Sequence, residues 1–435
     1  MKKLLATLLA SATALTAVGC LVACGGDKGP VLKVWAPGES IAAYEQLANQ
    51  FKKDNSQYAK YDIKFEPVEE GVVQTSMGKD PSTGAAVFFF PSDHLYKLNK
   101  AKVLQPLTSE YVDIVKGRDE QFTYEFATVE EQLLAFPATN DNGYFLYYDS
   151  RVLSEQDVAS LDTLQARAKE LGKHIAFNYG DVFNAASFYI GTDCEFGYGD
   201  HTMQTYHTTL DSEAGKTATK AYLKYFDPAL NNGYDSTDKV ITNGILADGL
   251  AGGTYIAGVD GTWKWSTIKE KMEAKEKGSS EYIKTAVLPS FTVDGDDTTY
   301  YMGSFYGAKY CGVNRQKDKD TIRASLALAE YFTSKEGQLA RYAATYSGPS
   351  NIEAAQDPTV AADPRIVTYK AQVARKGRLH RDQSGDFWSP SGFGNLMNKI
   401  ATGKIKDADH PNETDEQAAF RTLKELAESM EKAAK

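Results

Sequence analysis

Cysteine is scarce in this sequence, with 4 among 435 residues. No C-x-x-C pair occurs, and none of the 6 histidines belongs to an H-E-x-x-H motif. These absences exclude a disulfide scaffold and disfavour a metal centre built on zinc. Cys194 and Cys311 lie far apart in the chain, so the sequence is equally compatible with two buried free thiols and with a disulfide.

Blocks of basic charge are absent as well. The chain carries 48 Lys and Arg against 58 Asp and Glu, a net charge of -10, and no run of five or six basic residues occurs. A phosphate backbone is therefore a poor partner, and we expect no nucleic acid. The G-x-S-x-G elbow of hydrolases and the phosphate-binding loop of nucleotide-binding enzymes are also missing.

The composition that remains is that of an ordinary globular protein. Hydrophobic residues make up 42% and charged residues 24%, and the 35 Gly and 14 Pro are too few for a collagen-like or disordered chain. We find no internal repeat and no low-complexity tract. At roughly 150 residues per domain, the length predicts two to three domains.

The N-terminus has the pattern of an export signal. Lys2 and Lys3 precede an almost uncharged stretch that runs to Ala23. Leu21-Val22-Ala23-Cys24 resembles a bacterial lipobox, which implies removal of residues 1–23 and acylation (palmitate) of Cys24; Cys20 is a second, weaker candidate. A membrane-spanning anchor is the alternative, but its many small and polar residues disfavour it. Residues 24–30 then form a Gly-rich linker, and we expect a lipoprotein on the extracytoplasmic face of the cell membrane.

From Val31 onward, short apolar runs alternate with helical periodicity, which predicts an α/β fold with mostly parallel sheets flanked by helices. Strands are expected at 31–35, 61–65, 85–90, 174–177 and 254–258, with a hairpin around the turn at 294–296. Helices are expected at 41–51, 161–171, 319–332, 336–345 and 415–434.

Several segments, in order, resemble the extracellular solute-binding proteins of ABC importers, specifically the family-1 sugar binders typified by maltose-binding protein. The matching segments include residues 32–51, 85–104, 137–153, 253–268 and 387–388. The resemblance implies two lobes joined by three crossovers, with the ligand closed between them. It assigns residues 31–138 and 290–333 to lobe 1, and residues 139–289 and 334–435 to lobe 2.

A sugar presents an apolar face of C–H groups and a rim of hydroxyls, so its binder needs aromatic planes beside carboxylates or amides. Ligands in open α/β sheets lie beyond the carboxyl ends of the strands. Asp93 follows the strand at 85–90, Asp181 and Phe183 follow the strand at 174–177, and Trp263 follows the strand at 254–258. These residues are thus candidates for one site.

The resemblance implies roles for further residues. Trp263 and Trp388 match stacking tryptophans, and Phe183 and Asp181 stand where the family has Tyr and Glu. The other ligand-binding candidates are Glu39, Phe90, Asp93, His94, Asp141 and Asn142. Purely structural roles remain open as alternatives to ligand binding: Phe90 could belong to the core, Glu39 and Asp93 could cap turns, and Trp265 could pack behind Trp263. Three or four aromatic positions are kept, which favours a carbohydrate, whereas several polar partners differ from those of maltose-binding protein, which argues against maltose itself.

The expected function is therefore capture of a carbohydrate, such as a maltooligosaccharide, and its delivery to an ABC permease in the membrane. We expect a monomer without a cofactor and without enzymatic activity. Two alternatives stay open. One is a binding protein of the same architecture for a polyamine, iron or a phosphorylated solute. The other is an exported glycoside hydrolase, which would need two carboxylates at a fixed separation.

Overall fold

A computed structural model describes residues 29–198, 205–227, 240–242, 244–381, 383, 385–389 and 391–433. The expected signal segment (residues 1–23) and both candidate lipidation cysteines lie outside the described residues. In the described part, Cys194 and Cys311 are buried free thiols. No helix there is both long and apolar enough to span a bilayer, and no cluster of metal-binding side chains is found there.

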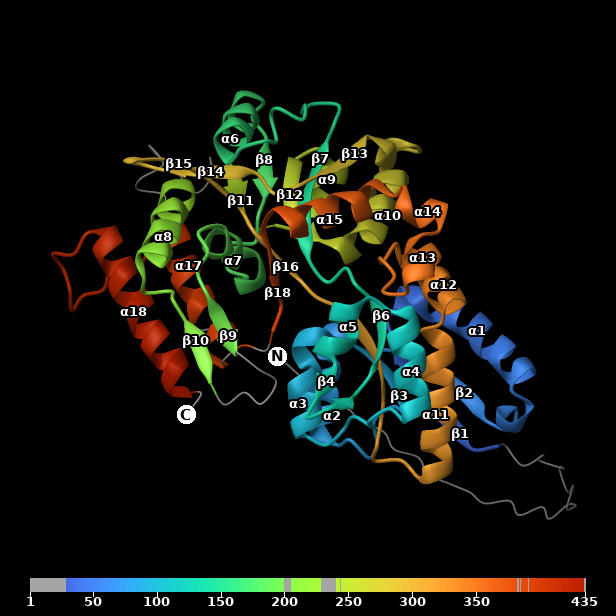
Figure 1. Cartoon of the computed structure of the whole chain (residues 1–435). Coiled ribbons are helices and arrows are strands. Elements are labelled where there is room, and N and C mark those ends of the chain that lie inside the picture. The colour runs from blue at the N-terminus through green and yellow to red at the C-terminus, as the bar shows by residue number, and fades with distance from the viewer. Residues whose placement is uncertain are drawn as a thin grey trace, which may run out of the picture.

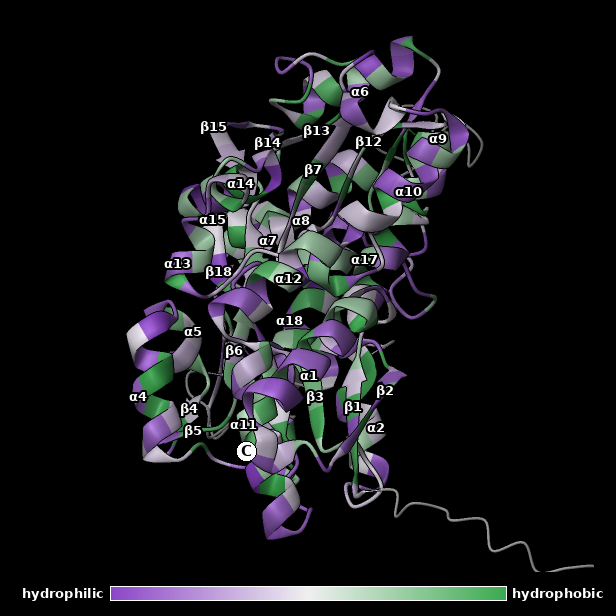
Figure 2. Cartoon of the chain, turned by 90° about the vertical axis from the view of Figure 1, so that its right-hand side faces the viewer, coloured by the Kyte–Doolittle hydropathy of each residue, from purple (hydrophilic) through white to green (hydrophobic). Residues whose placement is uncertain are grey.

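Lobe 1 is built on a five-stranded sheet with the order β2-β1-β3-β17-β6 (Figure 1). Four strands run in one direction, and β17 runs antiparallel to β3 and β6. Helices cover the sheet, so strand β3 is apolar throughout and appears hydrophobic along its length in Figure 2. The strands are β1 (Val31–Ala36), β2 (Asp62–Pro67), β3 (Val87–Pro91), β6 (Phe136–Thr139) and β17 (Lys309–Val313); the helices are α1 (Ile41–Asp54), α2 (Val73–Lys79), α3 (Leu95–Lys100), α4 (Ser109–Arg118), α5 (Gln121–Phe126) and α11 (Lys319–Phe332).

Lobe 2 repeats this plan with the order β11-β8-β12-β7-β13. Here β7 is the reversed strand, antiparallel to β12 and β13. The strands are β7 (Tyr144–Asp149), β8 (His174–Ala176), β11 (Ile241–Thr242), β12 (Tyr255–Gly261) and β13 (Ile283–Ala286); the helices are α6 (Leu161–Glu170), α7 (Val182–Gly191), α8 (Glu213–Phe226), α9 (Leu246–Gly252), α10 (Trp265–Lys275), α15 (Pro364–Lys376), α16 (Gly385–Trp388), α17 (Phe393–Ala401) and α18 (Asp415–Ala433). The predicted two-lobed α/β fold with mostly parallel sheets is confirmed.

Residue alternation explains how the lobe 2 sheet is covered on both faces. Along β7, Tyr144, Leu146 and Tyr148 enter the larger apolar core. Phe145 and Tyr147 point to the other face and pack with α9 and α10. Strand β7 is buried over its whole length for this reason.

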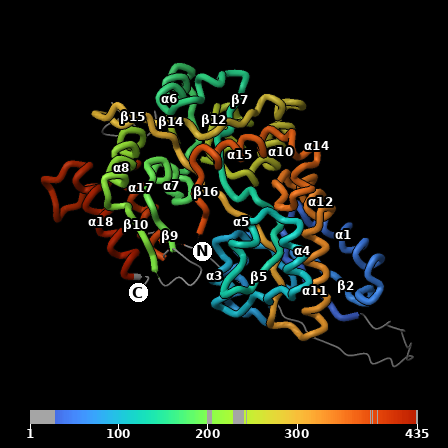
Figure 3. Tube along the Cα trace, in the orientation of Figure 1, coloured from blue at the N-terminus to red at the C-terminus, as the bar shows by residue number. Residues whose placement is uncertain are grey.

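The three crossings between the lobes lie side by side and are hydrogen-bonded to one another. The first joins β6 to β7, and the second joins the short strand β16 (Ser304–Tyr306) to β17. Asn142 N–H donates to Gly307 O (3.1 Å), and Asn140 N–H donates to Gly348 O (3.0 Å) of the third crossing. The tube in Figure 3 shows the chain passing between the lobes in this region.

The second crossing differs from the boundary expected at residue 290. Phe291 and Phe305 belong to the core of lobe 2, and Ala308 is the first residue after them that packs in lobe 1. The hairpin of β14 (Ser290–Val293) and β15 (Asp296–Tyr301) remains on lobe 2 because Phe291 packs against Phe188 of α7, with 5.0 Å between ring centroids.

The third crossing differs as well. Helix α12 (Lys335–Thr345) was assigned to lobe 2, but it packs on α1 and α11 of lobe 1. The short helices α13 (Ile352–Ala355) and α14 (Pro358–Ala361) follow it and lead to α15 on lobe 2. The chain therefore changes lobes after α12, because the buried polar groups of this helix find their partners in lobe 1.

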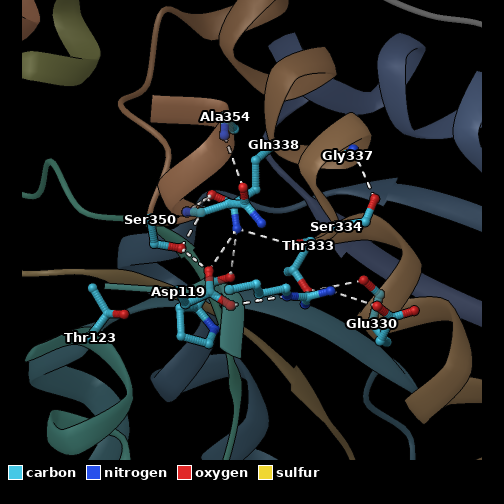
Figure 4. A network of polar contacts seen from close by, with 12 residues as sticks. Asp119, Thr123, Glu330, Thr333, Ser334, Gly337, Gln338, Ser350 and Ala354 are labelled. Carbon is cyan, nitrogen blue, oxygen red and sulfur yellow. Dashed lines mark hydrogen bonds and ion pairs between the residues drawn. The ribbon is translucent and has the colours of Figure 1, made fainter. Parts of the chain in front are cut away.

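A buried network around Gln338 of α12 fixes this crossing (Figure 4). Its amide nitrogen donates to Asp119 Oδ1 (3.1 Å), to Pro137 O (3.3 Å) and to Thr333 O (2.9 Å). Its amide oxygen accepts from Ser350 Oγ (3.2 Å) and from the backbone N–H of Asn351 (2.9 Å). One side chain thus joins the ends of α4, β6 and α11 to the third crossing.

We expect Gln338→Leu to lower the free energy of unfolding by about 2–4 kcal/mol, because the substitution leaves buried donors and acceptors without partners. Chemical denaturation monitored by circular dichroism measures the change. Lys335→Ala on the same helix is the matched control; its ion pair with Glu353 is exposed and screened by solvent, so its loss should leave the free energy of unfolding nearly unchanged. Equal effects of the two substitutions would contradict the role assigned to Gln338.

Candidate ligand-binding cleft

A cavity of about 770 Å³ lies between the lobes. Side chains from both lobes and from the first crossing line it. Lobe 1 and α12 contribute Pro37, Glu39, Glu69, Glu70, Gly71, Pro91, Asp93, His94, Lys309 and Arg341. Lobe 2 contributes Asp181, Phe183, Trp263, Lys264, Thr267, His380 and Trp388, and the crossing contributes Asn142.

Eight of the ten residues predicted as ligand-binding line this cavity: Glu39, Asp93, His94, Asn142, Asp181, Phe183, Trp263 and Trp388. Four of them share one local structure, in which a strand ends in a single 3-10 turn that leads into a helix. Glu39 lies in the turn after β1, Asp93 and His94 lie in the turn after β3, and Trp263 lies in the turn after β12. These turns place polar and aromatic side chains at the carboxyl ends of the strands.

The other two predicted residues have structural positions. Phe90 is fully buried in lobe 1, with its ring 5.7 Å from the rings of both Phe88 and Tyr310. Asp141 is 3% exposed, and its carboxylate accepts from the backbone N–H of Gly348 (2.6 Å). Neither side chain lines the cavity, because β3 is covered on both faces and Asp141 turns into the third crossing.

Lobe 2 presents an aromatic wall. Phe183 lies at its centre, with ring centroids 6.0 Å from Trp263, 5.3 Å from Phe305 and 5.1 Å from His380. Trp388 extends the wall beyond His380, at 5.7 Å. Trp265 does not take part; it is buried and stacks parallel to Tyr147, as the packing interpretation of the sequence held.

Lobe 1 presents a charged wall that the sequence did not indicate. Glu70 is shared by two cations, with Oε1 2.6 Å from Arg341 Nη2 and Oε2 3.0 Å from Lys309 Nζ. Burial alone would raise the pKa of Glu70, but Arg341 and Lys309 hold it at about 2. Arg341 also donates to Tyr44 OH (3.2 Å).

The strand-end rule could have found Glu70, since it follows β2 directly. Lys309 opens a strand and Arg341 lies inside a helix, so neither occupies a position that the rule selects. They reach the cleft only because β17 and α12 return to lobe 1 late in the chain. No local pattern around either residue signals that return.

Polar and cation–π contacts bridge the cleft directly. Ser266 Oγ of lobe 2 donates to Glu39 Oε2 of lobe 1 (2.7 Å). Lys309 Nζ of lobe 1 lies 5.3 Å from the ring centroid of Trp263 in lobe 2, a cation–π distance. On the lobe 2 side, burial raises the pKa of Asp181 and raises that of nearby Asp260 to about 6.

Comparison with protein families identifies the architecture. Residues 46–368 match the model for bacterial extracellular solute-binding proteins. The chain belongs to this family. A search of curated proteins finds no match by sequence.

Solved structures share the fold at low sequence identity. A chain solved with acarbose is 23% identical, with a TM-score of 0.76 over 94% of this chain and 100% of that one. The unliganded maltodextrin-binding protein MalE1 of L. casei is 22% identical (TM-score 0.72, 92% and 99% covered). The maltotriose-binding protein of Thermus thermophilus is 15% identical (TM-score 0.69, 92% and 99% covered).

The shared carboxylate is the group on which the charged wall depends. We expect Glu70→Gln to lower the free energy of unfolding at pH 7 by about 3–5 kcal/mol, because it leaves Lys309 and Arg341 as buried unpaired cations. Since the pKa of Glu70 is depressed to about 2, its contribution is present above the ordinary value of 4.5 and is lost as the pH falls toward 2. The free energy of unfolding of Glu70→Gln should therefore fall less steeply than that of the wild type as the pH is lowered.

Denaturant titrations from pH 7 to pH 2.5 measure both effects. Glu69→Gln is the matched control, since the neighbouring Glu69 is exposed at the cavity rim. If the free energy of unfolding of Glu70→Gln decreased toward low pH as steeply as that of the wild type, the ion-pair assignment would be contradicted.

Proposed function

We propose that this protein captures a carbohydrate between its lobes and delivers it to an ABC permease. The aromatic wall carries the proposal. The rings of Trp263, Phe183 and Trp388 line a cavity whose opposite wall is polar. A hexose has the same division into an apolar face and a hydroxyl rim, so its rings would stack on lobe 2 while its hydroxyls meet lobe 1.

Cavity size favours an oligosaccharide, such as a maltooligosaccharide. Ligand pockets span about 300–1,000 Å³, and the cleft lies in the upper half of that range. The neighbours in fold are described as binding acarbose, maltodextrin and maltotriose, which agrees with a ligand of several sugar rings. Their identity is too low to transfer a particular sugar.

The cavity chemistry supports the other ligand classes less well. An iron site would use Tyr and His ligands, but no Tyr lines the described cavity. A phosphate ester would need several free cations, but Lys309 and Arg341 already share Glu70, and Lys264 is the one further Lys or Arg that lines the described cavity. A hydrolase would need a carboxylate pair beside the aromatic wall. The carboxylate of Asp181 instead accepts from the backbone N–H of Phe183 (3.0 Å), the contact of a helix N-cap.

Transport would follow from closure of the lobes. A ligand shifts the balance between open and closed forms only through contacts that it makes better in one form. A sugar stacked on lobe 2 and hydrogen-bonded to lobe 1 makes such contacts only when the lobes are closed. The closed form of a monomer, carrying no cofactor and catalysing no reaction, would be the species that the permease recognises.

We expect Trp263→Ala to weaken binding of maltotriose or longer maltooligosaccharides at least about thirtyfold, because it removes an indole ring from the aromatic wall. Isothermal titration calorimetry on the body from Gly29 onward measures the affinity. Tyr282→Ala, which removes an exposed aromatic ring outside the cleft, should leave the affinity unchanged. Absence of binding to every mono- and oligosaccharide by the wild type would refute the proposal.

We further propose that acyl chains on Cys24 hold the protein at the outer face of the membrane. An acidic body is not attracted to an anionic membrane surface, so lipid must supply the attachment. In a bacterial host labelled with a palmitate analogue, Cys24→Ser should abolish labelling, while Cys20→Ser should not. Loss of label in Cys20→Ser alone would move the lipidation site to Cys20.

A further inference from the structure

His380 lies within the aromatic wall although no motif in the sequence marks it. It follows β18 (Gly377–Leu379), which pairs in parallel with β16 of lobe 2. Its backbone N–H donates to Tyr306 O (2.7 Å), so the chain position is fixed by this short sheet. The residue is 3% exposed and lines the cavity.

The imidazole is enclosed by rings. Its centroid lies 4.6 Å from Phe305, 5.1 Å from Phe183 and 5.7 Å from Trp388. Neither ring nitrogen has a hydrogen-bond partner in the described part of the chain. A buried polar group without a partner is unfavourable, and the cavity is where such a partner can enter.

Charged groups reach the imidazole from one direction. Asp93 Oδ1 lies 3.6 Å from His380 Nδ1, just beyond hydrogen-bond distance. His94 follows Asp93 in the turn after β3. Among the other titratable groups on the packed elements, Asp181 lines the same cavity, but its carboxylate caps α7 through the N–H of Phe183, and Asp386 on α16 accepts from Ser429. Arg378 on β18 lies over the ring of Phe196.

We propose that His380 is a ligand-binding residue. One of its unpartnered ring nitrogens forms a hydrogen bond with a sugar hydroxyl, and the imidazole must be uncharged for the lobes to close. The proposal rests on the carbohydrate-binding function proposed above. A neutral imidazole offers one donor and one acceptor, the same pair that a hydroxyl offers in return. Ring contacts with Phe183 and Trp388 place that pair beside the stacking surfaces.

The same geometry links affinity to pH. Burial lowers the pKa of His380, and this outweighs the opposing attraction of Asp93; His94 lowers it further. Opening of the cleft would withdraw Asp93 and His94 of lobe 1 and admit water to the side of the imidazole that faces the cavity, so its pKa would return toward the ordinary value of about 6.5. Protonation therefore favours the open form, so affinity should be highest above pH 7 and should fall as the solution is acidified.

Calorimetric titration with the best-binding maltooligosaccharide at pH 7.5 and at pH 5.5 tests this inference. We expect wild-type affinity to be about five- to tenfold weaker at pH 5.5. His380→Asn, which keeps hydrogen-bonding groups but cannot titrate, should bind with little change between the two pH values. His380→Phe, which keeps the ring packing without a polar atom, should bind at least about tenfold more weakly than wild type at pH 7.5.

The control is His207→Asn, which removes an exposed histidine paired with Glu195 and should retain the wild-type pH dependence. Melting temperatures at both pH values report whether each variant is folded. Unchanged pH dependence in His380→Asn, or wild-type affinity in His380→Phe, would overturn the inference while leaving carbohydrate binding intact. Absence of sugar binding at either pH would overturn the proposed function, and the role of His380 with it.

Discussion

The hydrogen bonds among the three crossings are the constraint on which this molecule depends. Backbone groups of the first crossing pair with the second at Gly307 and with the third at Gly348, while the carboxylate of Asp141 accepts from the N–H of Gly348. Gly143 completes the arrangement, since a side chain there would collide with Phe305 O at 2.3 Å. The two sheets are thus held by one compact bundle of backbone, about which they can rotate without losing their cores.

Each lobe supplies a different chemistry to the cleft. The lobe 1 wall is charged and already paired, because Glu70 satisfies both Lys309 and Arg341. Paired charges keep fixed positions and orient their remaining donors at low reorganisation cost. The lobe 2 wall is aromatic, and its polar members, His380 and Asp181, have few partners of their own. A ligand that joins the two walls gains contacts which neither lobe alone provides, which is the physical requirement for coupling binding to closure.

Sequence reasoning succeeded where the position of a residue at the cleft follows from local order along the chain. Glu39, Asp93, Asp181 and Trp263 all directly follow a recognisable strand, and the two-lobed fold follows from strand and helix alternation together with the family resemblance. It failed where position depends on the return of distant segments. Lys309, Arg341 and His380 reach the cleft through β17, α12 and β18, whose partners in strand pairing or ion pairing lie more than 70 residues away in the chain.

Phe90 and the lobe boundary expected at residue 290 show two other cases in which the sequence pattern could not predict the structure. In a strand buried on both faces, no polar alternation marks which side chain points toward a site, so Phe88, Phe89 and Phe90 look alike in sequence although all three are core. A hairpin between two sheets likewise carries no signal for the lobe on which it packs. That choice is made by tertiary contacts, here the burial of Phe291 against Phe188.

The third crossing also reaches the stacking residues through contiguous packing. Tyr346 ends α12 in a left-handed conformation (φ 61°), which is unfavourable for a residue with a side chain. Its hydroxyl accepts from Lys269 Nζ (2.7 Å), and the Arg365 guanidinium lies between the rings of Tyr346 (4.6 Å) and Trp265 (4.5 Å). Helix α10 begins at Trp265, two residues after Trp263. The turn that contains Trp263 is therefore connected to the third crossing through the packing of α10. Any rotation at the third crossing must therefore either carry Trp263 with it or break this cluster.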